Sequence, residues 1–335
     1  MTDKPLMVLE GHPVLEYQPA IDIATGRLLG FEALVRWDHP TKGHIPPKVL
    51  IPWAEANDDI VSLNAWVIAE ACNTAQRWPS GIQMAVNCSI AQLRQGEASK
   101  AVATALETSG LNPDRLSIEV TEHAIADDDA AAELRSLVAL GVHLAVDDVG
   151  TSWSSLQPLR RFAVETVKID EAFVANLEAE EGMNRAIVEA VIHVSHSLAM
   201  STVAEGVETA QQVATLREFG ADVAQGFFFS PPLANEEADE LAKRDPRPVF
   251  TLEPGPDRLS PVEAGLQAKP LSIVAPVGRA PSKTPQAGSS PEVQDEASGA
   301  TPKPARPRQH AGKPAHLSPK PTDTAGAPDE SSQAG

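Results

Sequence analysis

Short apolar runs recur between residues 14 and 225, and most of them end in a polar residue that a hydrophobic core would not select. Runs of this length and composition are typical of buried strands. Helix-like segments lie between them, and several end in a glycine such as Gly110, Gly141 or Gly220. The runs are residues 28–31 before Glu32, 83–86 before Asn87, 116–118 before Glu119, 142–146 before Asp147 and Asp148, 164–167 before Lys168, 201–204 before Glu205, and 221–224 before Gln225.

This alternation predicts parallel strand pairing, and about eight such units close into a (β/α)8 TIM-like barrel. Because the carboxyl ends of barrel strands meet at one mouth, we expect the polar residues at those ends to share a cleft. The competing fold is an open doubly wound sheet. It needs a glycine-rich phosphate loop after a strand, and the sequence has none, so the barrel is favoured.

Composition sets the expected domain limits. From residue 244 onward the chain is dominated by Pro, Ala, Ser, Gly and Gln and carries no periodic apolar face. We therefore predict an N-terminal extension at residues 1–10, one folded domain at 11–243 and a disordered tail at 244–335. A basic cluster of Lys303, Arg306 and Arg308 is a candidate contact for an unknown protein, with a solvated linker as the simpler interpretation.

The formal net charge is −19, which argues against binding to polymeric nucleic acid or to an anionic membrane surface. The N-terminus has no basic region followed by an apolar run, and no stretch of membrane-spanning length lacks polar residues. Cys72 and Cys88 sit in apolar surroundings without the spacing of a disulfide framework or zinc site. These features predict a cytoplasmic protein.

Carboxylates gathered in one cleft repel each other unless cations hold them together. Oxygen ligands from Glu, Asp and Asn suit Mg²⁺ first, with Mn²⁺ or Ca²⁺ as competitors. The adjacent Asp147 and Asp148 suit two ions, which form a clamp for phosphoryl hydrolysis. No serine or cysteine nucleophile motif with a histidine partner occurs, so we expect direct attack by water activated by two metal ions.

A set of motifs in fixed order then resembles one family, the EAL domain family of cyclic di-GMP-specific phosphodiesterases. The signature motif of the set is Glu32-Ala-Leu-Val-Arg-Trp37, and the whole set covers nearly all of the folded domain. It continues with Tyr17-Gln-Pro19, Val86-Asn-Cys-Ser89, Glu119-Val-Thr-Glu122, Asp147-Asp148, Lys168-Ile-Asp170, Glu205-Gly-Val-Glu208 and Gln225-Gly226. The resemblance implies hydrolysis of cyclic di-GMP to linear pGpG with two Mg²⁺ or Mn²⁺ ions, inhibition by Ca²⁺ and assembly as a homodimer.

The resemblance also implies a role for each matching residue. Lys168 would position the attacking water, Glu208 would act in catalysis beside the metal ligands Glu32 and Asp147, and Glu122 would anchor the loop that follows the paired aspartates. The implied metal ligands are Glu32, Asn87, Glu119 and Asp147 for the first ion and Asp147, Asp148 and Glu205 for the second. The implied substrate contacts are Gln18, Arg36 and Gln225.

The loop after the paired aspartates departs from the family pattern at Val149, Ser152 and Trp153. A serine in place of glycine restricts the backbone where positive φ is needed. The alternative function is therefore an effector that binds cyclic di-GMP with weak or no turnover. A more distant alternative is a lyase that uses Lys168 as a Schiff base, which requires a lysine away from carboxylates.

Overall fold

In the computed structural model of this chain, the described residues are 10–149, 161–178, 182–244, 250–252 and 259–261. Ser152 and Trp153 of the altered loop lie outside these ranges, as does most of the predicted tail. Within the tail segment, two short strands, β10 (Phe250–Leu252) and β11 (Leu259–Pro261), pair antiparallel, although the sequence predicts no regular structure there.

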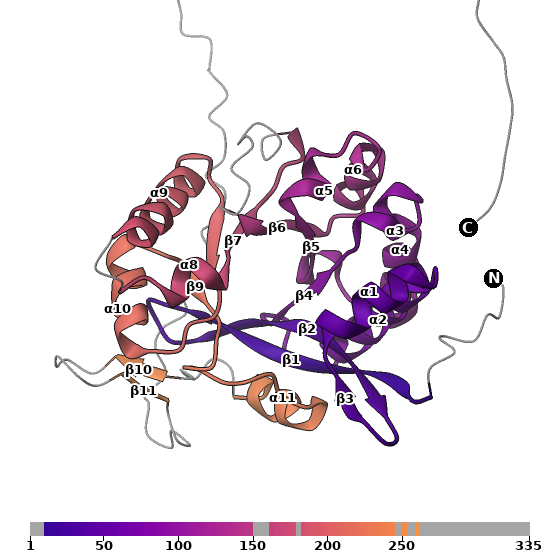
Figure 1. The fold of residues 1–335 in the computed structure, drawn as a ribbon, viewed down its shortest axis with the longest axis horizontal. Coiled ribbons are helices and arrows are strands. Elements are labelled where there is room, and N and C mark those ends of the chain that lie inside the picture. Colours follow the sequence, from indigo (N-terminus) through magenta and orange to yellow (C-terminus); the bar gives the residue numbers. More distant parts are fainter. Residues whose placement is uncertain (1–9, 150–160, 179–181, 245–249, 253–258, 262–335) are drawn as a thin grey trace, which may run out of the picture. The chain divides into compact units, whose positions relative to one another are not determined.

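The predicted barrel is confirmed. Among the described residues a nine-stranded sheet runs in the order β1-β9-β8-β7-β6-β5-β4-β2-β3, and pairing between β1 and β2 closes it (Figure 1). The short strand β3 (Gly43–Ile45) only extends a hairpin with the far end of β2. The closing strands are β1 (His12–Asp22), β2 (Leu28–His39), β4 (Gln83–Asn87), β5 (Leu116–Thr121), β6 (His143–Val149), β7 (Thr166–Ile169), β8 (Ser201–Ala204) and β9 (Val223–Ala224).

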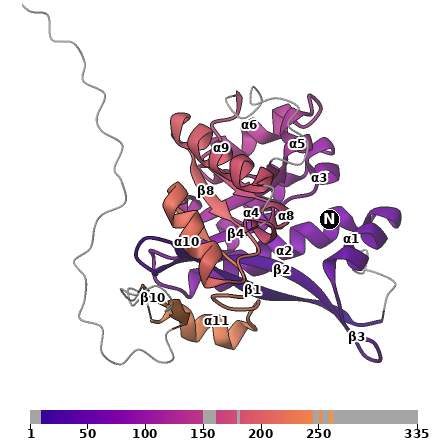
Figure 2. The same cartoon turned by 60° about the vertical axis from the view of Figure 1, so that its left-hand side comes forward.

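Two details of the expected strand pattern need correction. Strand β1 runs antiparallel to both of its neighbours, whereas the remaining barrel pairs are parallel. Glu32 does not end its strand, because β2 continues for seven residues beyond it to His39 and forms a long hairpin with β1. Figure 2 shows this hairpin extending beyond the barrel toward β3.

The helices pack on the outside of the barrel and begin and end where the local chemistry allows. Thr209 and Gln212 form a capping box at the start of α10, and Gly220 ends the helix in a left-handed conformation at φ 83°. Gly110 ends α4 in the same way. The helices are α1 (Pro47–Ala56), α2 (Ile60–Gln76), α3 (Ile90–Arg94), α4 (Ala98–Ser109), α5 (Glu122–Ala126), α6 (Ala131–Ala139), α8 (Glu171–Ala175), α9 (Met183–Ser197), α10 (Ala210–Phe219) and α11 (Asn235–Ala242), with a 3-10 turn at Pro113–Arg115.

The main core lies between the strands and these helices. The side chains that alternate outward on the strands, such as Met84, Val86 and Ile118, are fully buried there. Burial of such side chains contributes about 1.5–3 kcal/mol each relative to exposure. No helix in the described part of the chain is long and apolar enough to cross a membrane.

Candidate active site

A lysine lies at the centre of the predicted constellation. The Nζ atom of Lys168 lies 2.5 Å from Oε1 of Glu205, 2.7 Å from Oε2 of Glu119, 3.1 Å from Oε2 of Glu32 and 3.7 Å from Oδ1 of Asp147. Its side chain is 2% exposed. Five parallel strands, β2, β5, β6, β7 and β8, thus bring together residues separated by as many as 173 positions in the sequence.

Two amides fix the orientation of the Glu32 carboxylate. Nδ2 of Asn87 donates to Oε1 of Glu32 at 2.7 Å, and Nε2 of Gln225 donates to Oε2 at 2.7 Å. Gln225 also donates to Oε1 of Glu205 at 3.1 Å. On the neighbouring strand, Gln18 lies directly opposite Glu32 in the β1–β2 register. The structure therefore places the predicted residues Gln18, Asn87 and Gln225 around Glu32.

The paired aspartates lie at an irregularity in strand β6. The register with β7 shifts between Val146 and Val149, and Asp148 has a positive φ of 59°, which is uncommon for a residue with a side chain. The backbone N–H of Asp148 donates to Oδ1 of Asp147 at 2.9 Å. A regular strand would point the two carboxylates to opposite faces, so this distortion is what permits both to serve one site.

Burial and mutual repulsion shift the protonation of these carboxylates. Burial, with the charge of Asp147 as a further cause, raises the pKa of Glu205 to about 8. The pKa of Glu119 also lies well above its usual value, because of burial and the nearby charge of Glu32. For Glu32, burial opposes ionisation, but the cation of Lys168 and the hydrogen bonds from Gln225 and Asn87 lower its pKa overall. The site is therefore short of positive charge.

Asp170 is a part of this site to which the sequence interpretation assigned no role. Burial, then the charge of Asp147 and a hydrogen bond with Asp170, together raise the pKa of Asp148 to about 6. Asp170 also accepts from the backbone N–H of Ala172 and so caps α8. Its position two residues after Lys168, within a quoted motif, was the available signal.

The donor set fits divalent cations by its chemistry. Carboxylate and amide oxygens from Glu32, Asn87, Glu119, Asp147 and Glu205 are hard ligands, and the raised carboxylate pKa values show where added positive charge would be stabilised. Among the described residues, however, no three acidic, histidine or cysteine side chains already form a group that could hold an ion. Lys168 instead acts as their counter-ion.

Arg36 lies farther along β2, four residues beyond Glu32 and on the same face of the strand. Its Nε atom lies 2.9 Å from Oε2 of Glu16 on β1, and one terminal nitrogen donates to the carbonyl of Val35. His44 of β3 approaches the same carboxylate at 3.7 Å. Glu16 was not singled out in the sequence, where nothing marks it as the partner of Arg36.

Two predicted residues are placed less directly. Glu122 is buried at the first position of α5, immediately after β5, but the loop that it would anchor lies outside the described residues. Glu208 has an exposed side chain, and its backbone N–H donates to Oε1 of Gln212. The structure does not bring Glu208 into the contacts of Lys168, so its catalytic role stays a prediction.

The fold and the site together define a (β/α)8-like barrel in which carboxylates from several strands surround one lysine. Residues 6–232 match the family model described as "EAL domain". This chain belongs to the EAL domain family.

Relatives with known sequences and structures agree. The chain is 42% identical over 227 residues to an uncharacterized signaling protein of Caulobacter vibrioides and 38% identical over 235 residues to the cyclic di-GMP phosphodiesterase NbdA of Pseudomonas aeruginosa. These matches cover 67% and 68% of this chain but only 28% and 30% of the relatives' own lengths. A solved structure described as the PaMucR phosphodiesterase in complex with c-di-GMP is 36% identical with a TM-score of 0.65, over 68% of this chain and 94% of that one.

Proposed function

We propose that this protein hydrolyses cyclic di-GMP to linear pGpG with two bound Mg²⁺ or Mn²⁺ ions. The observation that carries the proposal is the cluster of Glu32, Glu119, Asp147 and Glu205 around Lys168, within a family whose relatives include a named cyclic di-GMP phosphodiesterase. Bound divalent ions would supply positive charge to the phosphodiester and make the attacking water more acidic.

The chain's own residues would hold the reacting groups. Glu32, Asn87, Glu119, Asp147, Asp148 and Glu205 are the proposed metal ligands. Asn87 and Gln225 keep the Glu32 carboxylate in one orientation through their amide hydrogen bonds. Arg36 and Gln18 extend the same face of the barrel toward the substrate, and an arginine beside a phosphate oxygen supplies a charge-assisted hydrogen bond.

Lys168 holds its proton on Nζ in the metal-free cluster. Burial alone would lower its pKa, but the surrounding charges, led by Glu119 and Glu205, raise the pKa well above the usual value. The ammonium group therefore donates to the attacking water and orients it, rather than acting as a base. The same ammonium argues against the Schiff-base lyase, which needs a neutral amine.

One observation favours a second candidate, an effector that binds cyclic di-GMP without cutting it. Lys168 already neutralises part of the carboxylate charge, and the described side chains do not form a metal-ready group. Cyclic di-GMP would then be held by the mouth of the barrel while the acidic cluster stays closed by its lysine.

The distinguishing experiment incubates the full chain with cyclic di-GMP and Mg²⁺, Mn²⁺ or EDTA and separates the products by anion-exchange chromatography. Binding is measured in parallel by calorimetry with Ca²⁺, which we expect to inhibit. Linear pGpG that forms only with Mg²⁺ or Mn²⁺, and not in Glu119→Gln, supports the enzyme. Binding without product supports the effector, and neither binding nor product rejects both.

We also propose that the protein acts in the cytoplasm, as the sequence predicts. Homodimer formation and binding of a protein to the tail remain predictions of the sequence.

A further inference from the structure

The barrel is hollow on the side of the cluster that faces away from the proposed substrate mouth. In barrels of this type, layers of bulky branched side chains usually fill the interior. Here the inward positions below the cluster carry small side chains, and a cavity of about 210 Å³ lies among Gly30, Ala85, Ser117, Ala145 and Thr166. One water molecule needs only about 10–15 Å³ of such space, so the cavity has room for several.

Exposure of the strand residues shows that solvent reaches this cavity, which we call the rear chamber. On β4, the outward-facing Met84 and Val86 are 0% exposed, whereas the inward-facing Ala85 between them is partly exposed. On β8, Thr202 and Ala204 are likewise 0% exposed, and the intervening Val203 is partly exposed. In a packed barrel the inward-facing side chains are buried. On these two strands the outward-facing side chains are the more buried ones, because helices cover the outside of the barrel and solvent enters the inside.

The rear chamber opens where the parallel strands begin. Its rim includes Leu29, the second residue of β2, together with Gln83 and Ser201, which are the first residues of β4 and β8 and are exposed. This end is opposite the one that carries Asn87 and Glu205. The rear chamber is therefore a separate opening and not part of the proposed substrate mouth.

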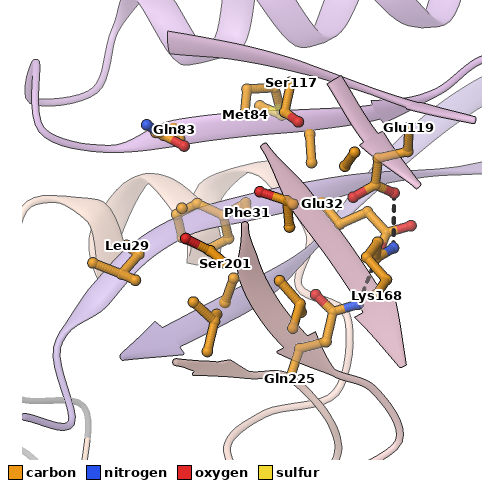
Figure 3. Close-up of a pocket in the computed structure, with 17 residues that line it drawn as sticks. Leu29, Phe31, Glu32, Gln83, Met84, Ser117, Glu119, Lys168, Ser201 and Gln225 are labelled. Atoms are coloured by element: carbon orange, nitrogen blue, oxygen red, sulfur yellow. Dashed lines mark hydrogen bonds and ion pairs between the residues drawn. The ribbon is translucent and has the colours of Figure 1, made fainter. Parts of the chain in front are cut away.

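The inner end of the rear chamber is the acidic cluster itself. Glu32, Glu119, Lys168 and Gln225 line it, and Figure 3 shows Glu119 and Lys168 at one side of the pocket with Leu29 and Gln83 at the other. Four carboxylates surround a single ammonium group there, so full ionisation leaves net negative charge that attracts cations. The hydroxyls of Ser117 and Thr166 on the walls offer oxygen atoms that can replace hydration water.

We propose that the rear chamber is a second route by which water and a partly hydrated divalent cation reach and leave the cluster. This inference rests on the proposed function, because the route matters most when the cyclic dinucleotide covers the mouth. Two proposed ligands, Glu32 and Glu119, are reached from the chamber side, so an ion can exchange there without displacing the nucleotide.

The test blocks the chamber while leaving the proposed ligands intact. Ser117 and Thr166 lie on β5 and β7, with β6 between them, so the double variant Ser117→Leu/Thr166→Leu fills the space from two sides. The matched control, Ser117→Ala/Thr166→Val, removes both hydroxyls but keeps the chamber open. Thermal unfolding and circular dichroism of both variants establish that the barrel forms.

The measured quantity is the rate of Ca²⁺ release into a fluorescent chelator in a stopped-flow instrument, with and without saturating cyclic di-GMP, which chromatography checks to be intact. We expect release from the open control to change less than about threefold when the nucleotide binds. In the blocked variant we expect release to be about twofold slower without nucleotide and at least about tenfold slower with it.

Equal release rates from the blocked and open variants, in both states, would overturn the proposal. Release that nearly stops in the wild type when the nucleotide binds would overturn it as well, since the mouth would then be the only route. Failure of cyclic di-GMP to bind would instead contradict the proposed function. The Ca²⁺ release rates of the blocked and open variants without nucleotide would then still show whether the ion passes through the chamber.

Discussion

The ammonium nitrogen of Lys168 lies 2.7 Å from a carboxylate oxygen of Glu119, and both side chains are at most 5% exposed. Two side chains from β7 and β5 thus form a buried ion pair inside the barrel. A buried pair is expensive to desolvate and is strongly destabilising when one partner is removed. The pair therefore links the stability of the barrel to the same residues that we assign to its chemistry.

Replacing this lysine tests that link. In Lys168→Met, without divalent metal, we expect the free energy of unfolding to fall by about 3–5 kcal/mol, because the carboxylates lose their buried cation. The measurement is urea denaturation in EDTA and again in Mg²⁺, which we expect to restore part of the loss. In the control Lys100→Met, whose ammonium pairs with Glu97 on the surface, we expect a much smaller change. Equal stability of Lys168→Met and the wild type in EDTA would contradict this account.

Stability without metal should fall as pH rises. The pKa of Glu205 is about 8 in the folded protein, and its ordinary value is 4.5. Between pH 4.5 and pH 8 the carboxyl group of Glu205 is therefore protonated in the folded state but ionised in the unfolded state. The free energy of unfolding therefore decreases through this window, by up to about 1.4 kcal/mol per pH unit for one proton. Urea denaturation in EDTA at several pH values measures the slope. In Glu205→Gln we expect the free energy of unfolding to depend less on pH. A free energy of unfolding that rises from about pH 5 to 8 in the wild type would contradict the prediction.

Glu16 should position Arg36 for the substrate. In Glu16→Gln the guanidinium loses its charged partner at 2.9 Å, and we expect KM for cyclic di-GMP to rise about fivefold with kcat changed less than about twofold. The control is Asp38→Asn on the same hairpin, whose carboxylate approaches His44 at 3.8 Å. Steady-state kinetics separate the two constants. A fall in kcat with unchanged KM would assign Glu16 to the chemical step instead.

Arg115 should stabilise the barrel without acting in the site. Its guanidinium donates to the carbonyls of Ile82 and Ala75, where α2 ends and β4 is about to begin. Arg115→Leu removes the side-chain donor from both carbonyls, although that of Ala75 still accepts from the backbone N–H of Trp78, and we expect a loss of about 1–3 kcal/mol in the free energy of unfolding. In Arg94→Leu, which breaks an exposed pair with Asp127, we expect a much smaller loss of stability. A smaller effect for Arg115 than for Arg94 would refute this role.

The sequence predicts the barrel well because its signal is local. Apolar runs followed by Asn87, Glu119 or Lys168 mark strands and their direction, and glycines such as Gly110 and Gly220 mark helix ends. The sequence does not predict that β1 is antiparallel to its neighbours, because an apolar run does not indicate the direction of its strand. The length of β2 was also missed, because residues beyond Glu32 pack with a hairpin partner that no local pattern reveals.

Most of the cluster could be predicted, but its electrostatic state could not. Family order places Glu32, Glu119 and Glu205 together, yet the position of Lys168 among them depends on side-chain geometry. The rear chamber is also invisible in the sequence, because small residues on separate strands create a cavity only when those strands close into a barrel.

The most direct test of the central claim follows the oxygen atom of the attacking water. The full chain is incubated with cyclic di-GMP and Mn²⁺ in ¹⁸O-labelled water, and the product is analysed by mass spectrometry. We predict linear pGpG with one ¹⁸O in its 5′-phosphate, formed by the wild type and by Arg94→Leu but not by Glu32→Gln or in EDTA. Intact cyclic di-GMP after prolonged incubation with metal, or product that forms equally in Glu32→Gln, would contradict the claim.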